Sequence, residues 1–205
     1  MVASGGIENW ESIKTIRYDK AYKLFTVDGT IEQDVVQQHY YTFNPLTIEI
    51  ISVMDSTETI TRLNDGVYSR TVNGDTVDVS QEALKNSINA SFYVYSFPFN
   101  LQDDSPERTY LGEQTLLDTL TTNAIAYQYP GSKDKWTFYT DLKSGKVVAN
   151  LVNRPDHNSL VLNDSFQQAG GILWYQDRSS YRVDENNEIL YLRATYQYEN
   201  FEVTR

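Results

Sequence analysis

The feature of this sequence that most restricts its fold is an alternation of apolar and polar side chains with a period of two. Near the C-terminus, one side of a continuous stretch carries Leu190, Leu192, Ala194, Tyr196 and Tyr198. The other side of the same stretch carries Tyr191, Arg193, Thr195, Gln197 and Glu199. Successive side chains of a β-strand point to opposite faces of a sheet, so this pattern predicts a strand with one buried face.

A stretch near the N-terminus has the same alternation with one exception. Ile16, Tyr18, Tyr22 and Leu24 share an apolar face, and Lys20 is the charged residue on that face. Trp136, Phe138 and Thr140 alternate with polar or half-polar neighbours in the same way. Less regular strands are expected at 31–43, 46–54, 57–63, 66–72, 108–117, 121–129, 146–153, 159–163 and 171–183.

Short turn signals separate these stretches. The pairs Asp28-Gly29, Asp65-Gly66, Asn73-Gly74 and Ser144-Gly145 are of the kind that tight hairpins favour. Strands joined by such short connections pair antiparallel with their neighbours in sequence. The sequence therefore predicts a mainly β fold of roughly ten strands, an antiparallel meander curled into a barrel or half-barrel.

Two segments have helical spacing instead. The first is short, at about 7–13, and the second spans about 80–95, where Leu84, Ile88 and Phe92 recur with a period of about 3.6 residues. Asp78 followed by Gln81 resembles a capping box, which predicts that the second helix begins there. Pro98 predicts its end.

The second helix lies between two series of hairpins. An amphipathic helix in that position can bury its apolar side against the concave face of the sheet, so we expect it to cover that face as a lid. No linker rich in Pro, Gly or Ser and no internal repeat divides the sequence. A single domain is therefore expected over residues 1–205.

The charge balance excludes one class of partner. Lys and Arg number 17 against 28 Asp and Glu, which gives a formal net charge of -11. Nucleic-acid binding requires clustered Lys and Arg, so no nucleic-acid partner is expected, although the net charge leaves room for a local basic pocket. The most apolar stretch, 92–101, is far shorter than the roughly 20 residues of a transmembrane helix, so no membrane span is expected.

The sequence is poor in reactive side chains. It has no cysteine and two histidines. His39 is expected to be a strand histidine with satisfied hydrogen bonds, and His157 lies in an expected loop. No catalytic residue, metal site or cofactor is therefore expected. One enzyme hypothesis is left, a hydrolase or lyase that uses carboxylates and tyrosines of the concave face.

Aromatic residues concentrate at the end of the second helix. Five of the eight residues from 92 to 99 are aromatic. Such a cluster either fills the core or borders an apolar ligand cavity between helix and sheet. In the second case the residues expected to line the cavity are Leu84, Ile88, Phe92, Tyr95, Phe97, Phe99, Leu101, Trp136 and Trp174.

Several motifs together resemble a family of uncharacterised Bacteroidetes envelope proteins. The opening Ser4-Gly5-Gly6-Ile7-Glu8-Asn9-Trp10, followed by Ile13-Lys14-Thr15, resembles their usual start with His-Gly-Gly-Leu. The stretch 92–101 resembles their aromatic segment, Phe-Phe-x-x-Pro-Phe-x-Leu. Tyr110-Leu111-Gly112-Glu113 and Trp136-Thr137-Phe138-Tyr139-Thr140-Asp141 resemble their later strands. Two positions depart from the pattern, Ser4 in place of His and Asp103-Asp104-Ser105 in place of Asp-Pro-Gly.

The resemblance implies an antiparallel half-barrel with a helical lid, similar to the lipoprotein localisation factors LolA and LolB, which hold acyl chains in a concave apolar cavity. It also implies a location in the bacterial cell envelope, periplasmic or anchored to the outer membrane. Such anchoring usually depends on a lipid attached to a cysteine that would precede Met1. The family has no established catalytic residues, so the resemblance implies none here.

Two functions follow from these observations. The first is a non-enzymatic envelope protein that binds a lipid, an acyl chain or another hydrophobic ligand on the concave face of the sheet. The alternative is a structural or protein-interaction module of the envelope, with a filled core and no ligand.

Overall fold

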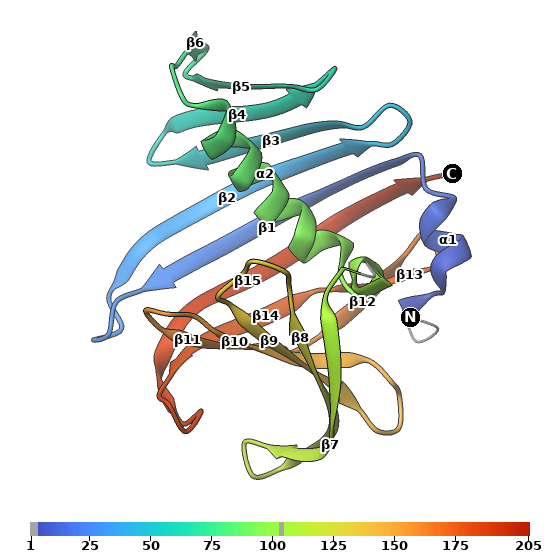
Figure 1. The fold of residues 1–205 in the computed structure, drawn as a ribbon. Helices are drawn as coiled ribbons and strands as arrows, with labels where there is room; N and C mark the ends of the chain where they lie inside the picture. Colours follow the sequence, from blue (N-terminus) through green and yellow to red (C-terminus); the bar gives the residue numbers. More distant parts are fainter. Residues whose placement is uncertain (1–3, 103–104) are drawn as a thin grey trace.

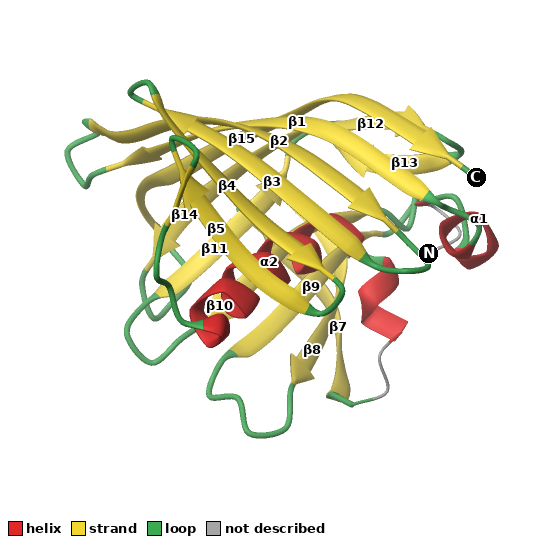
Figure 2. Cartoon of the chain, turned by 90° about the horizontal axis from the view of Figure 1, so that it is seen from above, coloured by secondary structure: helices red, strands yellow, loops and turns green. Residues whose placement is uncertain are grey.

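The computed structural model describes residues 4–102 and 105–205 and shows a large curved β-sheet with a helix across its hollow side (Figures 1 and 2). The first series of strands is β1 (Thr15–Phe25), β2 (Ile31–Thr42), β3 (Thr47–Met54), β4 (Thr57–Asn64), β5 (Val67–Val72) and β6 (Asp75–Thr76). The second is β7 (Glu107–Leu116), β8 (Leu120–Gln128), β9 (Lys135–Asp141), β10 (Val147–Asn153), β11 (Asn158–Asn163), β12 (Phe166–Ala169), β13 (Ile172–Tyr175), β14 (Asp177–Val183) and β15 (Ile189–Thr204). The helices are α1 (Ile7–Glu11), α2 (Gln81–Ser96) and the short 3-10 helix η2 (Phe99–Gln102).

Thirteen of these strands form one antiparallel sheet in the order β6-β5-β4-β3-β2-β1-β15-β14-β11-β10-β9-β8-β7. In the described chain the edge strands β6 and β7 do not pair with each other, so the sheet is an open half-barrel. The predicted mainly β fold and its antiparallel meander are confirmed.

The two series of strands meet where β1 pairs with β15. The pairing runs from Thr15 opposite Thr204 to Leu24 opposite Ala194. The connection between the two series contains α2, which therefore starts near the β5–β6 edge and ends beside β8 and β9 (Figure 1). This route places the helix inside the curve of the sheet (Figure 2).

The strand expected at 171–183 is two strands, and β12 was not expected. β12 and β13 form a separate hairpin that turns at Gly170 and Gly171, and β14 then joins the main sheet beside β11. Alternate positions are buried in β13, at Ile172 and Trp174, and at the start of β14, at Arg178 and Ser180, so the alternation of burial continues although the pairing partner changes at Gln176. Hydropathy alone does not reveal such a change of partner.

The N-cap of helix α2 lies two residues later than predicted. Its N-cap is Ser80, whose hydroxyl accepts a hydrogen bond from the backbone N–H of Ala83 at 3.2 Å, so the assignment to Asp78 was wrong. Gln81 binds the backbone of Tyr68 in β5 instead, donating to the carbonyl at 2.7 Å and accepting from the N–H at 3.1 Å. These two bonds hold the start of the helix to the sheet. The helix ends at Ser96, before Pro98, as expected.

The short helix α1 ends at Glu11, two residues earlier than expected, and its Trp10 joins the main hydrophobic core. The indole ring of Trp10 stacks on Phe99 with centroids 4.9 Å apart and also contacts Phe43 and Trp174. The chain enters this helix through Gly5, which has φ +106° and lies against the β12–β13 turn. Asp103 and Asp104 lie outside the described residues.

The close approach of Gly5 to the turn gives a first prediction. A Cβ atom at position 5 would lie 2.2 Å from the carbonyl oxygen of Gly171. Gly5→Ala should lower the free energy of unfolding by about 1–2 kcal/mol for the left-handed backbone and by about 1–3 kcal/mol more for the overlap.

Gly29→Ala is the matched control in urea unfolding, because Gly29 also has a positive φ (+83°) but no atom within 4 Å of its Cβ position. It should lose the backbone contribution alone. Equal losses in the two variants would show that the contact with Gly171 contributes nothing to stability.

Candidate functional site

A cavity of about 700 Å³ lies between α2 and the concave face of the sheet. Its lining comes from the helix and from strands of both series, so it spans the line where β1 meets β15. Ligand pockets in proteins usually have volumes of roughly 300–1,000 Å³. The cavity is therefore large enough for a small organic ligand.

One wall of the cavity is apolar. Phe97 follows the last residue of α2, and its ring centroid lies 4.8 Å from that of Phe138 in β9. The ring of Trp136, two residues before Phe138, is nearly parallel to the ring of Phe138, with the two centroids 6.1 Å apart. Aliphatic side chains of α2 and of four other strands also line the cavity: Leu24, Ile50, Val94, Val152 and Val161.

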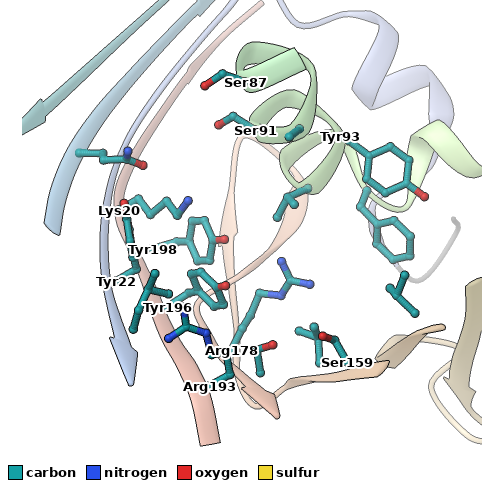
Figure 3. A pocket seen from close by; sticks show the side chains of 18 of the residues that line it. Lys20, Tyr22, Ser87, Ser91, Tyr93, Ser159, Arg178, Arg193, Tyr196 and Tyr198 are labelled. Carbon is teal, nitrogen blue, oxygen red and sulfur yellow. The ribbon is translucent and has the colours of Figure 1, made fainter. Parts of the chain in front are cut away.

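The opposite wall is polar and carries positive charge. Figure 3 shows Lys20, Arg178 and Arg193 there, with the hydroxyl groups of Tyr196 and Tyr198 near them. The complete set of cationic side chains that line the cavity is Lys20, Arg70, Arg154, Arg178, Arg182 and Arg193. Among the described residues that line it there is no Asp or Glu.

The register of the strands explains why Lys20 and Arg178 meet. Lys20 in β1 is opposite Tyr198 of β15, and Arg178 in β14 is opposite Tyr196 of the same strand. Tyr196 and Tyr198 are two residues apart, so they share one face of β15. The two cations therefore flank β15 on the cavity side, and Figure 3 shows them there.

Lys20 is held among aromatic rings. Its Nζ lies 5.0 Å from the ring centroid of Tyr22 and 5.5 Å from that of Tyr196, within the range of cation–π attraction. Burial lowers the pKa of Lys20, and the positive charge of Arg178 lowers it further, against an opposing effect of Tyr198. The folded protein thus disfavours the charge on this ammonium group.

Arg178 is the more deeply buried cation, with 8% of its surface exposed. Its Nε donates to Asn163 Oδ1 at 2.8 Å, and one terminal nitrogen donates to Asn150 Oδ1 at 3.4 Å. The guanidinium also lies over the ring of Tyr175, at 4.9 Å from the centroid. Amide oxygens and a ring fix the position of this group but do not neutralise its charge.

Beside the cavity, His39 is fully buried in a network of neutral groups, as expected for a satisfied strand histidine. Its Nδ1 lies 3.1 Å from the hydroxyl of Tyr41, and its Nε2 lies 3.1 Å from Gln37 Oε1. Burial holds the pKa of His39 well below its ordinary value, and the charge of Lys20 lowers it further. Burial also raises the pKa of Tyr41 to about 12. This network supports β2 and supplies no charge to the cavity.

The structure brings only part of the expected cavity lining to the cavity. Phe97 and Trp136 line it. Ile88, Phe92, Phe99 and Trp174 belong to or pack on the main core cluster with Trp10, Leu84 is buried, and Leu101 packs on the cluster around Phe97. The side chain of Tyr95 lies outside the described part of the chain.

The cations are the part of the site that the sequence analysis missed. Lys20 was visible as the charged exception on an apolar strand face, and that exception was the available signal. Arg193 was expected on the face opposite Tyr196, but the β14–β15 register shifts between Ser180, opposite Ala194, and Tyr181, opposite Leu192. Arg193 is the extra residue of this bulge, which breaks the alternation and lets it line the cavity with Tyr196.

The described residues contain neither a metal-binding cluster nor a membrane-spanning helix. Residues 4–102 and 105–205 contain no group of three or more His, Asp or Glu side chains placed to bind a metal ion. None of the helices in these ranges is long and apolar enough to cross a membrane.

Comparison with known proteins gives the class of fold. No protein-family model matches the chain, and no curated protein matches it. Among solved structures, it is similar to a DUF1329 family protein from Desulfovibrio piger, with a TM-score of 0.58, 9% identity, and coverage of 95% of this chain and 88% of that one. It is also similar to a putative outer membrane lipoprotein-sorting protein domain from Vibrio parahaemolyticus, with a TM-score of 0.56, 6% identity, and coverage of 96% and 89%.

These neighbours confirm the expected fold, a LolA-like open sheet with a helix across its concave face. At identities of 9% and 6% the likeness extends to the fold alone. Bacteroidetes origin is not tested by these neighbours and stays a prediction from the sequence motifs.

Burial of neutral His39 predicts a pH dependence of stability. The unfolded chain binds a proton on this histidine near its ordinary pKa of about 6.5, whereas the folded chain does so only at lower pH. The free energy of unfolding should therefore be highest above about pH 6.5 and fall below it, by at most about 1.4 kcal/mol per pH unit from this group.

His39→Gln should remove that part of the slope. The measurement is urea unfolding of both proteins at about pH 7.5 and about pH 5.5. Carboxylates that titrate in this range are present in both proteins, so the difference between the two slopes isolates His39. Identical slopes would contradict the assignment of a neutral His39.

Proposed function

We propose that this chain is a non-enzymatic cell-envelope protein that binds a lipid or another hydrophobic ligand in the cavity between α2 and the sheet. The observation that carries the proposal is the cavity of about 700 Å³ with Phe97, Trp136 and Phe138 in one wall. Burial of apolar ligand surface against such a wall contributes about 0.8 kcal/mol for each buried methylene group. A chain of several methylene groups would therefore bind with useful affinity.

Two observations support the non-enzymatic part of the proposal. Among the described residues no carboxylate lines the cavity, so the hydrolase or lyase hypothesis lacks the carboxylate that it requires there, although His157 and several tyrosines line the cavity. His39, the buried histidine beside the cavity, is engaged on both ring nitrogens. His157 lines the cavity with its Nδ1 2.9 Å from Oδ2 of the exposed Asp156, so the support comes from the missing carboxylate and from the engagement of His39.

The proposed location in the envelope rests on the fold shared with a putative outer membrane lipoprotein-sorting protein domain and on the resemblance of the sequence motifs. We include a periplasmic or outer-membrane-anchored position in the proposal, with a lipid anchor upstream of Met1. The encoded sequence upstream of Met1 tests this part. A signal peptide that ends in a lipobox cysteine would support anchoring, and its absence would remove the anchor from the proposal.

The alternative, a structural or protein-interaction module without a ligand, is favoured by a different observation. Ile88, Phe99 and Trp174 lie in the packed core and not around the cavity. Much of the aromatic segment therefore stabilises the fold, whatever the cavity holds. The alternative requires that the cavity contain only water in the working protein.

A substitution that fills the cavity separates the two functions. Ala90 is an exposed residue of α2 that lines the cavity, so Ala90→Trp should occupy the space without displacing the core. We expect it to lower the affinity for the neutral dye Nile red and for 1-hexadecanol by about tenfold or more, because an indole removes much of the volume available to a ligand.

Ala83→Trp is the matched control, since Ala83 is an exposed alanine of the same helix that does not line the cavity. It should bind both compounds as the unmodified protein does. Fluorescence titration and native mass spectrometry of gently purified protein provide the readouts. If the unmodified protein binds neither compound, or if both variants bind as it does, the proposed function is wrong.

A further inference from the structure

The sign of the charge in the cavity is opposite to that of the protein. The chain has a formal net charge of -11, with 28 acidic and 17 basic residues. Six of the basic residues line the cavity, and among its described lining residues there is no acidic one. A cleft lined by one sign of charge and bounded by protein of low dielectric concentrates its field on the space inside.

Two of these six cations have carboxylate partners. Arg193 pairs with Glu32 at 2.5 Å, and Arg154 pairs with Asp134 at 3.3 Å. The other four lie beyond 4.0 Å from every carboxylate of the described residues: Lys20, Arg70, Arg178 and Arg182. Arg70 donates to the hydroxyl of Thr61, and Arg182 donates to the hydroxyl of Ser159, so both point at neutral acceptors.

Lys20 and Arg178 form the centre of this group. They flank β15 on its cavity face, opposite Tyr198 and Tyr196 respectively. A guanidinium has five N–H donors, and two hydrogen bonds from Arg178 to described acceptors account for two of them. The hydroxyl groups of Tyr196 and Tyr198 lie beside the cations and can donate hydrogen bonds to the same acceptor (Figure 3).

Two like charges in a desolvated site oppose folding unless an anion is present. The effective cost of removing an ion from water is several kcal/mol when no partner compensates it. An aromatic or apolar residue at position 20 would avoid this cost. The neighbouring positions on the same strand face, Tyr18 and Tyr22, are aromatic. A charge that weakens the fold at this position is best explained by a ligand that uses it.

We propose that the ligand is an anionic amphiphile, an apolar chain that ends in a carboxylate or phosphate group, and that Lys20 and Arg178 bind the anionic end while Phe97, Trp136 and Phe138 contact the chain. This inference rests on the proposed function and adds the chemical class of the ligand. Arg binds carboxylate and phosphate oxygens through two parallel N–H bonds, and such charge-assisted bonds are about twice as strong as neutral ones. The separation of cationic and apolar walls sets the orientation of the ligand.

The test compares ligands that share one chain length and differ in the end group. Sodium hexadecanoate and monohexadecyl phosphate carry the anion, and 1-hexadecanol is the neutral counterpart. Inorganic phosphate distinguishes a free anion from a head group. Binding to the full chain is measured by displacement of Nile red and by native mass spectrometry, with Lys20→Gln, Arg178→Gln and the control Arg17→Gln.

The unmodified protein should bind hexadecanoate or monohexadecyl phosphate about tenfold or more tightly than hexadecanol, which is the usual size of a charge-assisted hydrogen bond. Lys20→Gln and Arg178→Gln should each remove most of that preference and leave hexadecanol binding unchanged. Arg17→Gln should keep the preference, because Arg17 lies on the same strand as Lys20 but does not line the cavity and pairs with Glu202.

The possible failures are distinct. Equal binding of hexadecanol and both anions, unchanged by Lys20→Gln, would overturn the anionic class and leave the proposed function intact. No binding of any long-chain compound would overturn both. Displacement by inorganic phosphate at the affinity of the long-chain phosphate would overturn the amphiphile in favour of a small anion.

Lys20→Gln keeps the test decisive if Arg178→Gln fails to fold, because Lys20 contacts rings and has no carboxylate partner among the described residues. The ligand-free Lys20→Gln protein should unfold at the same or a higher urea concentration than the unmodified protein, while its preference for the anion falls. A parallel loss of stability and of hexadecanol binding would show that Lys20 is structural, and would overturn its assignment to the anion.

Discussion

The antiparallel pairing of β1 with β15 is the interaction on which the rest of the structure depends. It joins residues about as far apart in the chain as this sequence allows, Thr15 and Thr204, and makes one sheet of two meanders. Because α2 connects the outer ends of those meanders, joining them draws the helix across the concave face. The hydrogen bonds of Gln81 at one end of the helix and of Tyr93 with Tyr129 at the other then hold it there. Without this pairing there would be two separate sheets and no enclosed space.

The same pairing places charge where a mainly apolar face would be more stable. Lys20 and Arg178 come from different meanders and are brought together by the residues of β15 between them. The aromatic residues of 92–101 have the opposite role, since most of them fill the core and stabilise the fold. Core packing and cavity lining therefore lie largely in different parts of the concave side, with Phe97 and Trp136 shared between the apolar cluster and the cavity.

Much of the fold could be predicted from the sequence because strand alternation and turn residues are local signals. Ile16 to Leu24 and Leu190 to Tyr198 showed their strands plainly, and Pro98 marked the end of α2. The helix start was misjudged because Asp78 and Ser80 are both good caps, and a contact of Gln81 with β5 decides between them. The site was harder to predict, because register and the bulge at Arg193 depend on partners far along the chain. Spacing within α2 shows which residues share a face, but not whether that face meets core or cavity.

The central position of β15 has a consequence for how the protein is made. β15 is translated after all the other described strands, and Arg178 lies in the strand just before it, β14. A growing or truncated chain that stops before β15 would contain Lys20 and α2 but neither Tyr196 nor Tyr198, and its two cations would have no common strand to bring them together. The arrangement of Lys20 and Arg178 around β15 thus forms only after β15 has been made and has paired with β1 and β14.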